Sequence, residues 1–275
     1  METLQQTDLS AQVLDYSVDP RLSTEVKAFL KVLNSGGPPV ESMSKQDARN
    51  VLIGAQASVN VDLSVLSGFS GVFVNYTPSP EAQYPQAINE IYAATKWVAE
   101  HGDEINVDGK NLAVVGNSVG GNMTAVTALK AKENNGPKIK LQIMMWPIVD
   151  ASFDTESYHL FGEQRFLTTS LMKWMYDQYT TDLNERKEIH ASPLQATVDQ
   201  LKGLPPALIQ VAENDILRDG GEAYGRKLDE AGVPVTTVRY NGVIHDFGLL
   251  NGLAEIPQTR SLFLQAAAEL KKYLK

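Results

Sequence analysis

The chain has 275 residues, of which 43% are apolar, so it can fold as one large α/β domain or two small ones around a sizeable core. Its formal net charge is −9 and it contains no basic tract, which argues against nucleic acid or an anionic membrane surface as a partner. The absence of cysteine excludes disulfides, thiolate metal sites and a cysteine nucleophile. With no signal-peptide pattern at the start and no run of about 18 apolar residues, we expect a cytoplasmic protein without a membrane span.

The first part of the chain offers one helix and one strand. Apolar residues at helical spacing predict a helix over residues 20–34, ended by a loop rich in glycine and proline. The apolar run GVFVNY, residues 71–76, precedes a pair of prolines and predicts a buried strand.

From residue 85 onward, predicted helices and strands alternate. The helices are expected at 85–102, 120–136, 220–232 and 258–274, and the strands at 111–116, 140–147, 205–215 and 235–242. Short apolar strands in this order indicate an α/β fold with a mostly parallel sheet and helices on both faces. Aromatic-rich helical pieces over 151–199 break the rhythm and predict a helical cap. We therefore expect one domain over 1–275, with cap elements from about 1–45 and 151–199.

The motif GNSVG, residues 116–120, lies between a predicted strand and a predicted helix. In a sharp strand-to-helix turn, small flanking residues let the backbone double back and expose the serine at the helix N-terminus, where the helix dipole favours developing negative charge. Ser118 is therefore a candidate nucleophile. The alternative is a glycine-rich turn whose serine only caps the helix.

A serine nucleophile needs a base and an acid, and both follow in suitable loops. Asp215 comes at the end of the predicted strand 205–215, and His245 follows the next strand, so the chain order is Ser118, Asp215, His245. Asp219 and Glu213 remain alternatives to Asp215 as the acid.

The remaining acidic and histidine candidates have simpler interpretations. Asp246, beside His245, is interpreted as a solvated side chain. Local or solvent-facing roles are expected for the other histidines, His101, His159 and His190.

These motifs also resemble a known family. GNSVGGN, ENDILRDGGEAYGRKLDEAGVPV and YNGVIHDFGLLN resemble the serine, acid and histidine blocks of the hormone-sensitive-lipase-like esterases, and the similarity extends from about Val65 to the C-terminus. The resemblance implies an α/β-hydrolase fold and a serine carboxylesterase for esters with short to medium acyl chains, with no metal or cofactor. It implies Ser118 as nucleophile, His245 as general base and then acid, Asp215 as the orienting acid, and the Val119 backbone N–H as an oxyanion donor.

The chain departs from the family pattern in three ways. Asn117 stands where the family usually has Asp, and Val119 where it usually has Ala. The His-Gly-Gly-Gly motif that donates further oxyanion N–H groups is missing, which indicates a deletion between Ser64 and Val65 that removed N-terminal strands. The strand at 111–116 should then have an open edge, filled either by residues 50–56 or by closing up of neighbouring strands.

The loss of that motif leaves the function open between classes. The chain is interpreted first as an impaired esterase, and alternatively as a non-catalytic relative that binds a small ligand or as an incomplete remnant. Trp174, Tyr176 and Tyr179 could line an acyl pocket, although cap packing is the favoured interpretation. Self-association into a homo-oligomer is left open.

Overall fold

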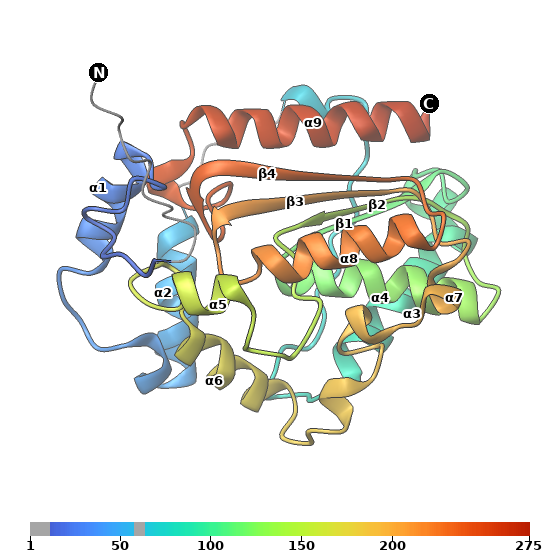
Figure 1. Ribbon diagram of the computed structural model, residues 1–275. Helices are drawn as coiled ribbons and strands as arrows, with labels where there is room; N and C mark the ends of the chain where they lie inside the picture. The colour runs from blue at the N-terminus through green and yellow to red at the C-terminus, as the bar shows by residue number, and fades with distance from the viewer. Residues whose placement is uncertain (1–11, 58–63) are drawn as a thin grey trace.

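A computed structural model describes residues 12–57 and 64–275. Within them one sheet of four parallel strands forms, with the spatial order β1-β2-β3-β4 (Figure 1). The strands are β1 (Leu112–Asn117), β2 (Ile139–Met145), β3 (Ala207–Asn214) and β4 (Val235–Ile244). Strand order follows chain order, so each crossover moves one position in the same direction.

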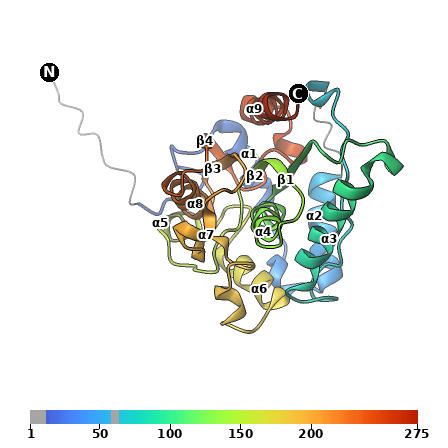
Figure 2. The same ribbon diagram turned by 90° about the vertical axis from the view of Figure 1, so that its right-hand side faces the viewer.

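Two helices that connect neighbouring strands lie on one face of the sheet. Right-handed crossovers that all move in the same direction place their helices on the same side, which is why α4 (Val119–Glu133) and α8 (Arg218–Glu230) share a face. The C-terminal helix α9 (Pro257–Leu274) covers the opposite face, as the end-on view in Figure 2 shows. The predicted arrangement, a parallel sheet with helices on both faces, is confirmed.

The central strands are apolar on both sides because each side has a helix layer. In β2, Leu141, Ile143 and Met145 pack into the cluster under α9, whereas Met144 packs into the cluster under α4 and α8. This explains why the strands have no polar alternation in the sequence.

The remaining helices pack beside the helices on the sheet or lie toward the carboxyl ends of the strands. Helix α3 (Gln86–His101) packs against α4, while α1, α2, α5 and α6 lie toward the carboxyl ends (Figure 1). The bounds of these four helices are Thr24–Leu33 for α1, Lys45–Gln56 for α2, Glu156–Phe161 for α5 and Thr169–Tyr179 for α6. The short helix α7, Val198–Leu201, packs against α8. Short 3-10 helices occupy Val40–Ser42, Ser64–Leu66, Gly102–Ile105, Glu185–Lys187, Pro193–Gln195 and Asn251–Leu253. None of the helices in the described ranges is long and apolar enough to cross a membrane.

The strand predicted over 71–76 is wrong. These residues have no regular secondary structure, and Phe73 is 96% exposed. Apolar, β-branched residues form a strand only where a neighbouring strand completes their hydrogen bonds, and none pairs with them among the described residues.

Within the described residues, no strand pairs with the outer edge of β1. Both proposed replacements are wrong: residues 50–56 belong to α2, and no described strand has closed up against β1. Val115 in this strand is 49% exposed. A backbone group in contact with water avoids the penalty of a buried, unpaired group, so an exposed strand edge can be tolerated.

The exposure of Phe73 makes a direct prediction for stability. We expect Phe73→Ala to change the free energy of unfolding by less than about 0.5 kcal/mol, because an exposed side chain loses almost no buried surface on truncation. Phe69, in the same segment but packed against the main core cluster, is the matched control, and Phe69→Ala should cost about 1 kcal/mol or more. Urea denaturation measures both. A loss of 2 kcal/mol or more for Phe73→Ala would contradict this exposure and would support the buried strand predicted over 71–76.

Candidate active site

Ser118 occupies the tight turn between β1 and α4. The strand ends at Asn117 and the helix begins at Val119, and Ser118 has φ 52° and ψ −117°, a backbone conformation that a residue with a side chain rarely adopts. Gly116 makes the turn sterically possible, because a Cβ atom there would overlap the backbone carbonyl group of Gly120. The conformation matches the strained strand-to-helix elbow predicted from the motif.

Strand pairing brings the acid and the base together. In the β3–β4 register, Asn214 pairs with Ile244, so the next residues, Asp215 and His245, emerge side by side at the carboxyl end of the sheet. Asp215 Oδ2 lies 2.8 Å from His245 Nδ1, and Asp215 Oδ1 accepts a hydrogen bond from the Leu217 backbone N–H at 3.0 Å. Both side chains are buried.

The other ring nitrogen of His245 faces the serine. Nε2 lies 3.1 Å from Ser118 Oγ, so one continuous chain of contacts runs from Asp215 through the imidazole to the hydroxyl. The structure thus brings together the three side chains that the sequence singled out. With Nδ1–H donating to the carboxylate, Nε2 has a free lone pair directed at the serine proton.

Opposing effects act on the pKa of His245. Burial of the ring disfavours the charged form, but the negative charges of Asp215 and Asp246 and the hydrogen bond that the ring donates to Asp215 outweigh it and raise the pKa above its usual value. The neutral imidazole is the form that accepts a proton from Ser118. Any reaction that depends on this base should therefore accelerate as the pH rises through the raised pKa.

The two alternative acids are engaged elsewhere. Asp219 Oδ2 accepts a hydrogen bond from the Ser157 backbone N–H on α5 at 2.7 Å, and its Oδ1 accepts one from Arg218 at 2.8 Å. Glu213 accepts the Gly242 backbone N–H at 2.8 Å. Of the three acids considered, Asp215 is the one in contact with His245.

The remaining histidines make local contacts, as expected. His101 lies 2.9 Å from Glu104, His159 2.9 Å from Asp154, and His190 2.8 Å from Glu133. All three are far more exposed than His245.

Asp246 is not the solvated side chain that the sequence suggested. It is only 6% exposed, and its Oδ1 accepts a hydrogen bond from Nε1 of the fully buried Trp146 at 2.7 Å. The Trp146 ring also packs edge-on against His245, with centroids 6.4 Å apart. The sequence did not single out either residue for the site. Asp246 adjoins His245, and Trp146 directly follows β2 at the same carboxyl end of the sheet.

The backbone N–H of Val119 is the oxyanion donor expected from the sequence. As the first residue of α4, it has no acceptor within its own helix, and it lies next to Ser118 at the positive end of the helix dipole. Two adjacent glycines, Gly36 and Gly37, stand much earlier in the sequence than Ser118, and both are exposed in the loop after α1. That Val119 serves as an oxyanion donor stays a prediction.

The aromatic residues Trp174, Tyr176 and Tyr179 each pack against neighbouring apolar side chains. Tyr176 is buried, its ring contacts Phe153, and its hydroxyl donates to the Asp150 carbonyl at 3.1 Å. Tyr179 packs edge-on against Tyr84, and Trp174 packs against the cap cluster. The structure places these side chains in packing contacts, and that residues 151–199 form a cap stays a prediction.

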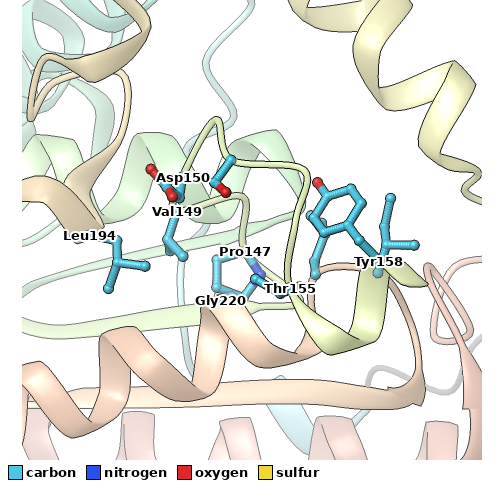
Figure 3. A pocket seen from close by; sticks show the side chains of 10 residues that line it. Pro147, Val149, Asp150, Thr155, Tyr158, Leu194 and Gly220 are labelled. Carbon is cyan, nitrogen blue, oxygen red and sulfur yellow. The ribbon is translucent and has the colours of Figure 1, made fainter. Parts of the chain in front are cut away.

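A small cavity lies beside the loop that carries Asp215. Ile216 and Leu217 form part of its wall, together with Asp150, Thr155 and Tyr158 (Figure 3). Its volume is about 30 Å³, enough for roughly one water molecule and too small for an acyl chain.

Comparison with known proteins places the chain in a family. A family model described as alpha/beta hydrolase fold matches residues 54–249, which include the whole predicted triad. An alpha/beta hydrolase of Acanthamoeba polyphaga mimivirus is 41% identical over 201 residues, covering 73% of this chain and 58% of that protein. Ethyl acetate hydrolase of Pseudomonas putida is 32% identical over 238 residues, covering 86% of this chain and 70% of that protein. The chain belongs to the hormone-sensitive-lipase-like alpha/beta hydrolase family.

A solved structure agrees with this assignment. The thermostable esterase from Pseudomonas putida ECU1011 superimposes with a TM-score of 0.89 at 48% identity, covering 94% of this chain and 99% of that one. Coverage of some curated relatives is lower: the chain spans 58% of the mimivirus protein and 54% of a vegetative-specific protein of Dictyostelium discoideum.

Proposed function

We propose that the chain is a serine hydrolase of carboxylic esters in which Ser118 is the nucleophile, His245 the general base and Asp215 the acid that orients it. The observation that carries this proposal is the continuous contact from Asp215 to His245 to Ser118, at 2.8 and 3.1 Å. Its support from relatives is that two of the similar proteins are named an ethyl acetate hydrolase and an esterase.

In the first half of the reaction, Ser118 Oγ attacks the ester carbonyl carbon while its proton moves to His245 Nε2. The charge that develops on the carbonyl oxygen is stabilised by the Val119 N–H and the N-terminal end of α4. When the tetrahedral intermediate collapses, the imidazolium returns the proton to the departing alkoxide. An alcohol leaves, and the acyl group remains on Ser118.

In the second half, water takes the place of the alcohol. His245 accepts a proton from water as its oxygen attacks the acyl carbon, and then returns the proton to Ser118 Oγ as the carboxylic acid leaves. Asp215 keeps the Nδ1 proton in place and stabilises the imidazolium in both halves. Every step uses side chains of the described site and water.

We expect slow turnover, because the sequence lacks the His-Gly-Gly-Gly donors. Losing one oxyanion donor typically costs about 100- to 1,000-fold in turnover. Short to medium acyl esters are the proposed substrates, since Ser118 is only partly buried and such substrates do not require a long enclosed acyl channel. Non-catalytic binding of a small ligand has less support, because a binding protein would not require Asp215, His245 and Ser118 to stand in continuous contact.

The test is covalent labelling of the purified protein with a fluorophosphonate. Attack by Ser118 Oγ on phosphorus expels fluoride, so mass spectrometry of the peptides identifies the modified residue. We expect labelling at Ser118, its complete loss in Ser118→Ala, and slow release of p-nitrophenol from p-nitrophenyl acetate by the unmodified protein.

Other outcomes would count against the proposal. A folded wild-type protein that stays unlabelled would refute it. Labelling of an equal extent in Ser118→Ala would assign the reactivity to a different residue.

A further inference from the structure

A second buried carboxylate lies beside the Ser118–His245 pair, and the mechanism above does not use it. Asp246 has φ 59°, a left-handed conformation that turns the chain immediately after the histidine. Its Oδ1 is held by the Trp146 indole N–H at 2.7 Å and lies 3.5 Å from the Asn117 side-chain amide. Gln56, at the end of α2, approaches Oδ2 at 3.4 Å. The carboxylate is thus held by groups from three separate segments of the chain.

The partners of Asp246 leave its charge uncompensated. Trp146, Asn117 and Gln56 are neutral donors, so they orient the carboxylate without cancelling its charge. Among the described residues, the cationic group within ion-pair range is His245, whose Nε2 lies 3.9 Å from Asp246 Oδ1. The field of Asp246 therefore acts mainly on the imidazole.

Asp246 and Asp215 act on opposite nitrogens of the same ring. Asp215 binds Nδ1 at 2.8 Å, whereas Asp246 stands beyond hydrogen-bond distance from Nε2, so that nitrogen remains free to face Ser118. In the part of the chain that the structure describes, the charged side chains that face the ring are these two carboxylates. Tyr158, on α5, is a further titratable group near Asp215.

We propose that Asp246 is a positioning residue that stabilises the protonated form of His245 from the Nε2 side while it anchors Asn117 beneath the nucleophile. The proposal rests on the function proposed above and adds a residue to it. When the proton of Ser118 moves to Nε2, positive charge appears next to Oδ1. A carboxylate fixed there in advance favours this charge without any rearrangement at the moment of reaction.

The direct test is an NMR titration of the histidines in 15N-histidine-labelled protein, wild type and Asp246→Asn. Asparagine has nearly the same shape and tolerates the left-handed conformation, so the loop should persist. We expect the pKa of His245 to fall in the variant, because one attractive charge is removed. His101, paired with Glu104 on a different part of the surface, is the internal control, and its resonances should be the same in the two proteins.

The same variant should change reactivity in a characteristic way. The rate constant for fluorophosphonate labelling of Ser118 should begin to rise at lower pH in Asp246→Asn, and its plateau at high pH should fall by on the order of tenfold. A purely structural role would lower thermal stability and leave the pKa of His245 unchanged, and that result would overturn the proposal.

A second test exchanges the carboxylate and the amide between positions 246 and 117. Asn117→Asp places a second carboxylate against Asp246, so we expect like-charge repulsion and a loss of labelling of about tenfold. Asn117→Asp combined with Asp246→Asn restores one carboxylate and one amide, and labelling should recover to within about threefold of the wild type. Additive losses in the double variant would contradict the proposed coupling.

The two proposals can fail separately. A wild-type protein that resists labelling refutes the esterase function, but the NMR titration still decides whether Asp246 acts on His245. Labelling of the wild type together with an unchanged pKa in Asp246→Asn refutes the role of Asp246 alone.

Discussion

Replacing Asp215 with Asn is expected to lower the rate constant for fluorophosphonate labelling of Ser118 by on the order of 10⁴-fold. The amide nearly matches the carboxylate in size but carries no charge to stabilise the imidazolium, and its NH2 group can donate to Nδ1 and so select the wrong tautomer of His245. Labelling rates at several pH values, with circular dichroism to verify folding, measure the effect.

Asp219→Asn and Glu213→Gln are the matched controls. Their wild-type carboxylates lie on the same segment as Asp215 but bind Ser157, Arg218 and the Gly242 backbone rather than the histidine. Labelling of these variants should remain within a few-fold of the wild type. If either control lost as much as Asp215→Asn, the choice of Asp215 as the acid would be wrong.

Gly116→Ala is expected to destabilise the protein by about 3 kcal/mol or more. The added methyl group would overlap the backbone of Gly120, and a backbone segment cannot move aside as a flexible side chain can. Displacing the turn would also shift Ser118 away from His245. Urea denaturation and fluorophosphonate labelling should both reveal the loss.

Gly120→Ala provides the contrast within the same motif. A Cβ atom at Gly120 has no heavy atom of the described residues within 4 Å, and the residue lies in the first turn of α4. Since Ala is a better helix former than Gly, we expect the free energy of unfolding to stay within about 1 kcal/mol of the wild type. Equal losses at both glycines would argue against this elbow geometry.

Most secondary structure from residue 85 onward could be predicted because its signals are local. Helix α1 also forms within the predicted range 20–34, although it begins only at Thr24, where the Ser23 side chain accepts a hydrogen bond from the Val26 backbone N–H. The nucleophile elbow was predictable for the same reason. Its requirements, a small residue at Gly116 and a helix directly after Ser118, involve neighbours in sequence.

The strand predicted at 71–76 fails because a strand is not a local structure. A run such as Val72-Phe73-Val74 favours extended backbone, but a stable strand needs hydrogen bonds from a neighbour. In the described residues no strand lies beside it, and Phe73 is left at the surface. The local preference of these residues for extended backbone therefore did not produce a strand.

The environment of Asp246 was also beyond the reach of the sequence. An acidic residue in a loop is ordinarily solvated, and nothing near it in sequence indicates otherwise. Its hydrogen-bond donor, Trp146, comes from a position 100 residues earlier in the chain. Only the parallel packing of the strands brings the end of β2 next to the loop after β4.

The sequence by itself determined which residues could form a nucleophile, base and acid, and in which loops they stand. Residue type and local turns are sufficient for that, because each group follows a predicted strand. The tertiary structure decided which acid meets His245, through the β3–β4 register that aligns Asp215 with the histidine. It also decided that Asp246 is buried and that no strand of the described ranges pairs with the outer edge of β1, since burial and strand pairing depend on contacts between segments far apart in the chain.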